Sequence, residues 1–239
     1  MAATKFSFER IEKKYFLTPE QQDAMIRAFR GHMVSDAYGR YSLCNIYYDT
    51  PDWRLIRASI EKPVYKEKLR VRSYGVPAGN GKVFVELKKK YEGVVYKRRI
   101  VLPACDAPAF LRGEAVPVND SQVGSEIQWF QRFYHAEPRV YIGYDRIAFA
   151  GVEDPNLRIT FDTNLRWRDT QLDLRAGNHG SLLLPWQQVL MEVKIPGACP
   201  LWLARLLTEL RLYPVSFSKY GTCYRDHIVN FDKEARFSA

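Results

Sequence analysis

The motif Glu-x-Lys occurs three times, each time within a stretch that otherwise alternates like a β-strand: Glu12 with Lys14, Glu86 with Lys88, and Glu192 with Lys194. Paired cations recur at the same two-residue spacing, as Arg70 with Arg72 and Lys97 with Arg99. Side chains two apart on a strand point to the same face of the sheet. Several strands therefore carry one apolar face and one cationic face with an occasional carboxylate. This pattern predicts a sheet that binds a polyanion and a metal ion.

Length and composition favour one folded domain. The 239 residues suffice for a large all-β or α+β domain with a full core. No Pro-, Gly- or Ser-rich linker interrupts the chain, and a hydrophobic content of 46% argues against disorder. We therefore expect a single domain over residues 1–239.

The charge balance favours acidic partners. Thirty-six Lys and Arg against 27 Asp and Glu give a formal net charge of +9, which suits nucleic acid, anionic lipid or phosphorylated small molecules. Charge alone does not choose among these partners.

The cysteines and the apolar segments exclude several classes of protein. The four cysteines are far apart and form no Cys-x-x-Cys or Cys/His cluster, so neither a zinc site nor a disulfide framework is expected. The first ten residues contain no apolar signal-peptide core, and no stretch approaches the roughly 18 apolar residues of a spanning helix. We expect a soluble, cytoplasmic protein without a membrane segment.

Periodicity and turn signals divide the chain into about eight strands with helices between them. Strands are expected over residues 8–16, 41–49, 65–74, 83–91, 94–102, 140–149, 157–165 and 189–195. Helices are expected after the capping box at Thr18, after Thr50-Pro51-Asp52, over 106–112, 125–134 and 200–212, and from Ser216 or Ser218 through His227. Residues 65–102 form an antiparallel meander, and the fold class is α+β.

The cationic faces have two interpretations. They are either the solvated outer face of a half-exposed sheet, or the lining of a β-barrel tunnel whose apolar faces pack against helices outside. The abundance of Arg favours the second, because Arg is the residue of bidentate oxyanion recognition. Each unpaired desolvated cation costs several kcal/mol, and six or more would exceed a net stability of roughly 5 to 15 kcal/mol. Such a tunnel must therefore be wet and hold an anion.

Phosphate chains suit this lining, because cations on several strands can surround their many oxygens. Carboxylates among the cations act either as partial neutralisers or as ligands for Mg²⁺ or Mn²⁺, which would bridge carboxylate and phosphate oxygens. The candidate metal ligands are Glu192, Glu86 and Glu12, with Asp162 behind them.

Nine short motifs, in order along nearly the whole chain, carry a family resemblance. They are Arg10 to Tyr15, Tyr48 to Pro51, Lys68 to Arg72, Glu86 to Lys88, Val95 to Arg99, Tyr144 to Arg146, Arg158 to Asp162, Glu192 to Lys194 and Phe217 to Tyr220. With these motifs the chain resembles the triphosphate tunnel metalloenzyme superfamily and, within it, the VTC (vacuolar transporter chaperone) catalytic domain of polyphosphate polymerases.

The resemblance implies roles for individual residues. The nucleotide triphosphate and the phosphate chain would be held by Lys14, Arg70, Arg72, Lys88, Lys97, Arg146, Arg158 and Lys219. Further substrate-binding candidates are Arg10, Lys68, Arg99, Lys194 and Ser216. Glu192 would hold the metal, with Glu86 and Glu12 as further candidates, and the C-terminal helix would lie near the tunnel mouth.

Two positions depart from the broader pattern. The superfamily signature on the first strand is Glu-x-Glu-x-Lys, and Arg10 stands at its first Glu position, which favours the VTC branch. Ser216 stands where some polymerase members carry a basic residue, which implies a weaker grip on product. The chain would be a stand-alone bacterial-type catalytic module, without the phosphate-sensing domain and the membrane helices of the fungal complex.

The expected function is metal-dependent phosphoryl transfer from ATP to a growing polyphosphate chain, with ATP and polyphosphate or pyrophosphate as partners. No general base is required, because the attacking phosphate oxygen is already ionised. One alternative is a hydrolase of the same fold, in which Glu12 or Glu86 orients water. The other is a non-catalytic binder of polyphosphate or nucleic acid. Nucleic acid is not the expected partner, since the recurring carboxylates would repel its backbone.

Overall fold

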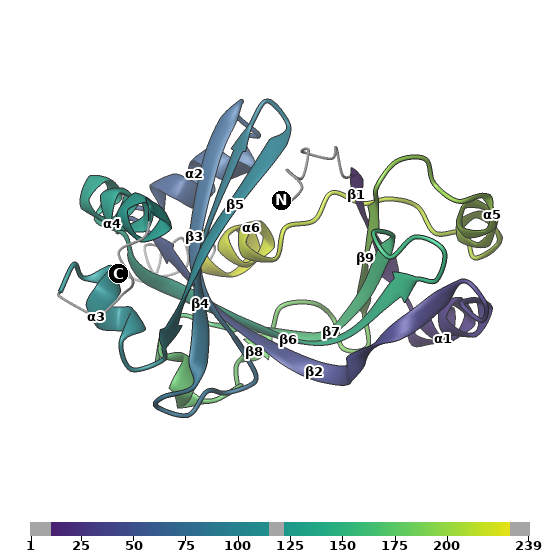
Figure 1. Cartoon of the computed structure of the whole chain (residues 1–239), viewed down its shortest axis with the longest axis horizontal. Helices are drawn as coiled ribbons and strands as arrows, with labels where there is room; N and C mark the ends of the chain where they lie inside the picture. Colours follow the sequence, from purple (N-terminus) through teal and green to yellow (C-terminus); the bar gives the residue numbers. More distant parts are fainter. Residues whose placement is uncertain (1–10, 115–121, 230–239) are drawn as a thin grey trace, which may run out of the picture. The chain divides into compact units, whose positions relative to one another are not determined.

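Figure 1 shows the computed structural model of the protein, which describes residues 11–114 and 122–229. Nine strands lie in this part of the chain: β1 (Ile11–Leu17), β2 (Met33–Asp49), β3 (Tyr65–Tyr74), β4 (Lys82–Tyr91), β5 (Val94–Pro103), β6 (Glu137–Gly151), β7 (Arg158–Arg168), β8 (Ser181–Leu182) and β9 (Val189–Ile195). The α-helices are α1 (Pro19–Ala28), α2 (Arg54–Ile60), α3 (Ala107–Leu111), α4 (Gln122–Tyr134), α5 (Leu201–Glu209) and α6 (Lys219–Cys223). A 3-10 turn, η1, spans Leu174–Ala176, and a π-helical turn, η2, spans Tyr224–Ile228.

The strands form one sheet in the order β1-β9-β7-β6-β2-β3-β4-β5, with β8 paired to β7. The ladders β1/β9, β7/β9, β2/β3, β3/β4 and β4/β5 are antiparallel. This confirms the expected α+β fold and the β3–β5 meander. Among the described strands, β1 and β5 end the order and no ladder joins them.

The chain divides into two compact units. Unit 1 comprises the described residues of Met1–Tyr41, Asp145–Asn164 and Leu184–Phe217, and unit 2 those of Ser42–Tyr144, Leu165–Leu183 and Ser218–Ala239. Strands β2, β6 and β7 each pass from one unit into the other. The single domain expected over residues 1–239 stays a prediction.

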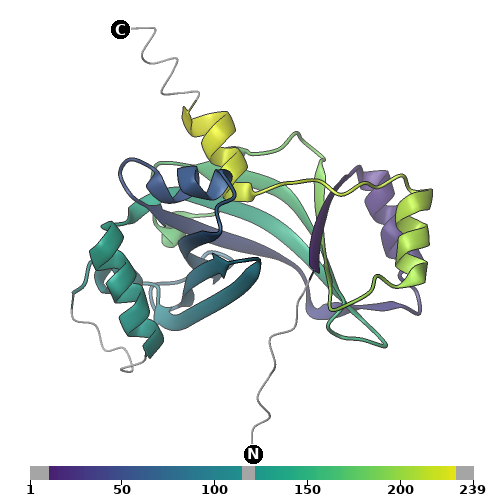
Figure 2. The same cartoon turned by 90° about the horizontal axis from the view of Figure 1, so that it is seen from above.

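In unit 1, alternate residues of β1, β7 and β9 build the apolar core. Tyr15, Phe161 and Met191 are buried there, together with Met25 and Phe29 from the first helix segment. Helices α1 and α5 lie side by side in both views (Figures 1 and 2). The helix α1 starts as expected, because Thr18 and Gln21 form a reciprocal capping box and Pro19 occupies the first turn.

In unit 2, the apolar faces of β2 to β5 pack against α3 and α4. Leu69, Val85 and Ile100 from the strands contact a cluster that includes Phe110 and Phe130 from the helices. Because strand side chains alternate, the residues between these apolar ones lie on the other face of the same strands. Both units therefore have the expected apolar and polar faces.

The start of α2 differs from the sequence-based expectation. The helix begins at Arg54, and Trp53 precedes it in a left-handed conformation with φ 62°. The carboxylate of Asp49 accepts hydrogen bonds from the amides of Leu55 and Ile56, both at 2.8 to 2.9 Å. Thr50 of the predicted cap does take part, because its Oγ1 accepts from the amide of Arg54 at 2.8 Å. The contribution of Asp49, five residues before the helix, is the part that the Thr-Pro-Asp pattern does not predict.

Other boundaries were also displaced. β2 begins at Met33, well before the expected residue 41, and β8 is a two-residue strand that periodicity cannot reveal. Of the two alternatives for the last helix, Ser218 is the cap, since its side chain accepts from the amide of Gly221 at 3.2 Å. The first expected strand begins in part outside the described residues, which start at residue 11.

Candidate functional site

A cationic face covers one side of the β3–β5 meander in unit 2; it consists of Lys68, Arg70, Arg72, Glu86, Lys88, Lys97 and Arg99. In the register, Lys68 lies opposite Lys88, and Lys88 lies opposite Lys97. Like charges directly opposite one another destabilise a sheet. Burial together with Lys90 and Lys88 lowers the pKa of nearby Lys66. This concentration of positive charge favours a bound anion.

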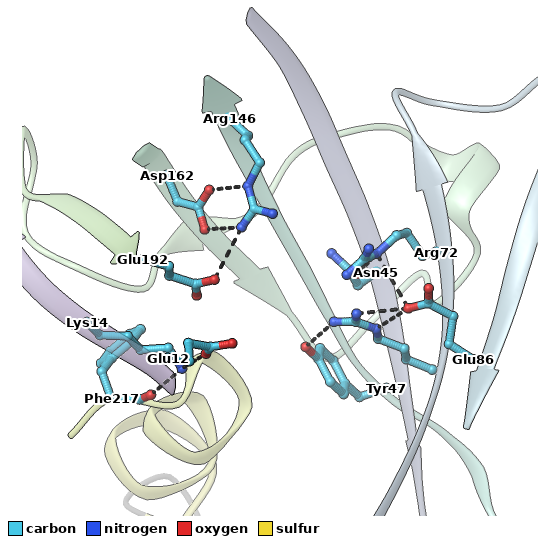
Figure 3. Close-up of polar contacts among 11 residues, drawn as sticks. Glu12, Lys14, Asn45, Tyr47, Arg72, Glu86, Arg146, Asp162, Glu192 and Phe217 are labelled. Carbon is cyan, nitrogen blue, oxygen red and sulfur yellow. Dashed lines mark hydrogen bonds and ion pairs between the residues drawn. The ribbon is translucent and has the colours of Figure 1, made fainter. Parts of the chain in front are cut away.

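Glu86 organises the cations of this face. Its side chain is 2% exposed, and Oε2 lies 2.8 Å from Arg70 Nη2 and 3.7 Å from Arg72 Nε (Figure 3). The other oxygen, Oε1, lies 2.6 Å from Lys97 Nζ. Burial raises the Glu86 pKa, but the charges of Arg70, Arg72 and Lys97 outweigh it and lower the pKa to about 2. Glu86 is therefore a carboxylate already held by three cations.

Two residues of β2 orient the guanidinium groups. Arg72 Nε donates to Asn45 Oδ1 at 3.2 Å, and Arg70 Nη1 donates to the Tyr47 hydroxyl at 3.3 Å (Figure 3). Asn45 is fully buried and its amide nitrogen donates to the carbonyl of Ile142 at 3.0 Å. We did not predict these two residues from the sequence. They alternate along β2 with the apolar Cys44, Ile46 and Tyr48, and this alternation indicates that Asn45 and Tyr47 lie on the polar face.

Lys219 lies at the start of α6, in the same unit. Its Nζ is 4.6 Å from the ring centre of Tyr144, a cation–π distance. The adjacent Tyr220 is buried, stacks on Tyr47 with ring centres 4.7 Å apart, and donates from its hydroxyl to Asp49 at 2.8 Å. The fold thus fixes α6 through Tyr220, and Lys219 with it.

Unit 1 has a second polar face, which lies on β1, β9 and β7 and includes Arg146 from β6. Its residues are Glu12, Lys14, Arg146, Arg158, Thr160, Asp162, Glu192 and Lys194. Lys14 lies opposite Glu192, Glu12 opposite Lys194, and Thr160 opposite Glu192 in the ladders. On β7 and β9 the residues between them, Ile159, Phe161 and Val193, belong to the apolar core. Unlike the unit 2 face, this one mixes carboxylates and cations in similar number.

Arg146 is held by a bidentate pair with Asp162. Its Nε and Nη2 donate to the two Asp162 oxygens at 2.6 and 2.7 Å, and Nη2 also lies 3.6 Å from Glu192 Oε2 (Figure 3). Asp162 is fully buried, so this pair fixes the guanidinium with little freedom. Lys14 Nζ lies 3.3 Å from Glu12 Oε1 and donates to the carbonyl of Phe217 at 3.0 Å.

The unit 1 face fits a hard divalent cation. Such an ion commonly takes one or two protein carboxylates and completes its shell with phosphate oxygens and water. Glu192 and Glu12 are diagonal neighbours across β1 and β9, and Thr160 Oγ1, opposite Glu192, is buried without a hydrogen-bond partner in the described chain. Burial lowers the pKa of Lys194 despite Glu192 and Glu12 beside it. Over residues 11–114 and 122–229, no three His, Cys, Asp or Glu side chains form a group that could hold a metal.

The structure sorts the predicted site residues into these two faces. Unit 2 brings together Arg70, Arg72, Lys88, Lys97, Lys68, Arg99 and Glu86, and unit 1 brings together Lys14, Arg146, Arg158, Lys194, Glu12 and Glu192. Arg158 and Ser216 are exposed. Arg10 lies outside the described residues. All three metal candidates contact cations: Glu86 contacts Arg70, Arg72 and Lys97, Glu12 contacts Lys14, and Glu192 contacts Arg146.

The family model for the VTC domain matches residues 9–227 of the chain. The chain belongs to the VTC domain family. This confirms the resemblance drawn from the nine sequence motifs, and the match includes all the site residues discussed above.

One curated relative of this VTC domain is a fungal protein. The chain is 29% identical over 160 residues to vacuolar transporter chaperone complex subunit 4 of Schizosaccharomyces pombe, a match that covers 58% of this chain and 22% of that protein. The chain therefore corresponds to less than a quarter of this relative's length.

Two solved structures share the fold of the VTC domain. A putative adenylate cyclase from Bacillus halodurans has a TM-score of 0.52 and 12% identity, covering 87% of this chain and 93% of its own. The putative adenylyl cyclase HpAC1 from Hippeastrum, described as having a dominant triphosphatase activity, has a TM-score of 0.51 and 16% identity, covering 91% and 95%. None of the described helices of the VTC domain is long and apolar enough to cross a membrane. The cytoplasmic location stays a prediction.

Replacing Tyr220 with Phe is expected to destabilise the VTC domain by about 1.5 to 3 kcal/mol, the range for a hydrogen bond to a charged group. The change removes the hydroxyl that donates to buried Asp49 and keeps the ring that stacks on Tyr47. Urea denaturation measures the loss. Tyr213→Phe, at a 75% exposed position, is the matched control and should leave stability unchanged. Equal stability of the two variants would show that the hydrogen bond from Tyr220 to Asp49 does not help to anchor α6.

Proposed function

We propose that this VTC domain catalyses metal-dependent phosphoryl transfer from ATP to a growing inorganic polyphosphate chain. In this reaction a terminal oxygen of the chain forms a bond to the γ-phosphorus of ATP, the bond from that phosphorus to the β,γ-bridging oxygen breaks, and ADP leaves. The observation that carries the proposal is the cationic face of unit 2, where three lysines lie opposite one another across β3, β4 and β5.

The cations of that face would bind phosphate oxygens. Arg70 and Arg72 are held at fixed orientations by Glu86, Tyr47 and Asn45, so they bind without first losing much side-chain freedom. Lys68, Lys88 and Lys97 add three further positive charges beside them. Such preorganised cations also stabilise the charge that spreads over the transferring phosphoryl group.

In unit 1, Glu192 and Glu12 would hold Mg²⁺ or Mn²⁺. When bound, the metal supplies neutralising charge for the phosphate oxygens that it contacts. Arg146, fixed by Asp162, and Lys14 would bind further phosphate oxygens. Thr160 Oγ1 has no hydrogen-bond partner within the described residues, and it would contact a bound water or phosphate oxygen.

The second candidate is hydrolysis of tripolyphosphate or of a nucleoside triphosphate, which the description of the Hippeastrum relative favours. A hydrolase needs a group that orients the attacking water. Glu86 suits this task poorly, because its pKa of about 2 makes it a weak base and three cations occupy its oxygens. Glu12 is the remaining candidate for that role.

Incubation of the purified protein with ATP and Mn²⁺, followed by sizing of the products on a gel, tests the proposal. We expect long polyphosphate chains and ADP, and no product in the presence of a chelator. Orthophosphate as the sole phosphate product would identify the hydrolase instead. Tight binding of polyphosphate with no turnover under any divalent metal would identify a non-catalytic binder.

A further inference from the structure

The cationic face of unit 2 ends in aromatic residues on one side. The two-residue period that places the cations on this face of the sheet continues to Tyr74 at the end of β3, Phe84 near the start of β4 and Val101 near the end of β5. These strands are antiparallel, and the register places Phe84 opposite both Arg72 and Val101. Tyr74, Phe84 and Val101 therefore form one surface, the aromatic end, which adjoins Arg72.

The aromatic end is accessible to a ligand. Tyr74 is 55% exposed and Val101 is 49% exposed, and Phe84 is half-buried. The rings of Tyr74 and Phe84 pack edge to face, with centres 5.8 Å apart. Because Phe84 braces the Tyr74 ring in this way, the exposed ring offers a flat surface that loses little further side-chain freedom when a ligand stacks on it.

Arg99 connects the aromatic end to the cations. Its guanidinium carbon lies 5.0 Å from the centre of the Phe84 ring, a cation–π distance. Arg70 and Arg72 contact Glu86, but within residues 11–114 and 122–229 the exposed side chain of Arg99 makes neither a hydrogen bond nor an ion pair. Its N–H groups are therefore available to a ligand that lies on the aromatic end.

The opposite end of the same face carries lysines. Lys66 on β3 lies directly opposite Lys90 on β4. The tyrosines next to them, Tyr65 and Tyr91, also lie opposite each other, but as alternate residues they belong to the other face of the sheet. The cationic face thus has two different ends, one that suits an aromatic ring and one that suits phosphate.

The spacing along β3 fits one nucleotide. Tyr74 and Arg72 are two residues apart, about 7 Å at the rise of a strand, which leaves room for a ribose between a stacked base and the first phosphate. Arg70 and Lys68 follow at equal steps. A single-stranded nucleic acid would need further aromatic residues for its successive bases, whereas the next positions of this strand face hold cations. The order of residues therefore matches one base followed by linked phosphates.

From the exposed ring, the adjoining cations and the lysines beyond them, we propose that the aromatic end binds the base of the nucleoside triphosphate, which stacks on Tyr74 with Arg99 beside it as a hydrogen-bond donor. This subsite sets the direction of the nucleotide, so that its γ-phosphate points along β3 towards Lys68 and away from Tyr74. The inference rests on the proposed phosphoryl transfer, since it names the subsite for the nucleoside of the phosphate donor.

Calorimetric titration without divalent metal, with ATP and with tripolyphosphate, tests this subsite, because tripolyphosphate has three linked phosphates and no nucleoside. Tyr74→Ala should weaken ATP binding about 5- to 150-fold, the range for one base stacked on an aromatic side chain, and leave the affinity for tripolyphosphate unchanged. Tyr74→Phe keeps the ring and should bind both ligands like the wild type. The matched control is Tyr96→Ala, since Tyr96 is 50% exposed and alternates with Lys97, on the other face of β5. It should also bind both ligands like the wild type.

The outcomes separate this subsite from the proposed function. Unchanged ATP affinity in Tyr74→Ala would overturn the base subsite and leave phosphoryl transfer standing. ATP binding that depends on Tyr74, without synthesis of polyphosphate, would support the subsite and contradict the polymerase. A wild-type protein that binds tripolyphosphate but not ATP would overturn both.

Photo-crosslinking with 8-azido-ATP locates the base on the wild-type protein, so it does not depend on the folding of any variant. The reactive azide is attached to the base, and we expect the label in the peptides that contain Tyr74 or Phe84. A label in the peptides around Lys66 and Lys90 would place the base at the lysine end and overturn the proposed direction of the nucleotide.

Discussion

Glu192→Gln is expected to reduce product formation from ATP by about 10²- to 10³-fold, the loss seen when one charge-stabilising group is removed from a site. The substitution keeps the size of the side chain and removes the charge that a divalent cation requires. Arg146 should stay in place, because its bidentate partner is Asp162 and its contact with Glu192 is longer, at 3.6 Å. A loss of activity in this variant would therefore be due to the missing Glu192 carboxylate and not to a displaced Arg146. Product sizing at saturating Mn²⁺ measures the effect.

Measuring the affinity for tripolyphosphate distinguishes a loss of turnover alone from a loss of the phosphate-binding site. With one negative charge fewer beside Lys14 and Arg146, the metal-free affinity for tripolyphosphate should be unchanged or higher in Glu192→Gln. Glu153→Gln, an exposed carboxylate in the turn between β6 and β7 of the same unit, is the matched control and should keep full turnover. Turnover of Glu192→Gln within a few-fold of the wild type would remove Glu192 from the metal site.

The two polar faces followed from the sequence because they depend on one local property, the two-residue period of a strand. That period alone places Arg70 with Arg72, and Lys97 with Arg99, on a common side, whatever the neighbouring strands are. The apolar alternation also predicted that helices would cover the other side, as α3 and α4 do. Strand boundaries within the β3–β5 meander were predicted almost to the residue.

The different roles of identical motifs could not be predicted. Glu86 and Glu192 both occur in Glu-x-Lys, but Glu86 lies between Arg70 on β3 and Arg99 on β5, whereas Glu192 lies between Lys14 on β1 and Thr160 on β7. Sequence spacing fixes the face of a residue and leaves its cross-strand neighbours open, because these depend on strand order and register. The neighbours make Glu86 an organiser of cations, and they place Glu192 beside Lys14 and Thr160 on the face that we propose to hold the metal.

Residues that act from a distant strand were also missed for this reason. Asn45 and Tyr47 orient Arg72 and Arg70 from β2, and Asp49 caps α2 while it accepts from Tyr220. Except for the contact between Asp49 and the α2 amides, each of these contacts joins residues that are more than 20 positions apart in the sequence. No local sequence pattern specifies such contacts. They became visible only when the pairing of β2 with β3 was known.

Glu86→Gln is expected to destabilise the protein by about 3 to 5 kcal/mol, the cost of removing one partner from a buried charge network. Arg70, Arg72 and Lys97 then lose their common counter-charge, while Tyr47 and Asn45 still contact the two guanidinium groups. Urea denaturation at pH 7 measures the loss. The control is Glu67→Gln, a buried carboxylate of β3 that contacts Lys89 and Tyr134 on the opposite face of the sheet. It should also cost stability, but without the enhanced response to added tripolyphosphate that is expected of Glu86→Gln.

The pH dependence of the loss identifies its cause. The pKa of Glu86 is lowered from 4.5 to about 2 in the folded protein, so its contribution is complete above about pH 4.5 and is lost as the pH falls towards 2. This difference in pKa corresponds to about 3 kcal/mol. The stability gap between wild type and Glu86→Gln should therefore be constant at neutral pH and shrink in acid. A gap that stays constant down to pH 2 would mean that the charge of Glu86 does not hold the cations.

An added anion should compensate for the missing carboxylate. Tripolyphosphate stabilises whichever protein it binds by mass action, by about 2.7 kcal/mol at a hundredfold excess over its dissociation constant. Without Glu86, the three cations repel one another and offer more net positive charge, so tripolyphosphate should bind Glu86→Gln more tightly than the wild type and raise its midpoint of thermal unfolding further. Equal shifts in both proteins would show that the cations held by Glu86 do not meet phosphate. A larger shift in Glu86→Gln, absent from Glu67→Gln, would mean that Glu86 stands in for an anion on this face until a phosphate chain arrives.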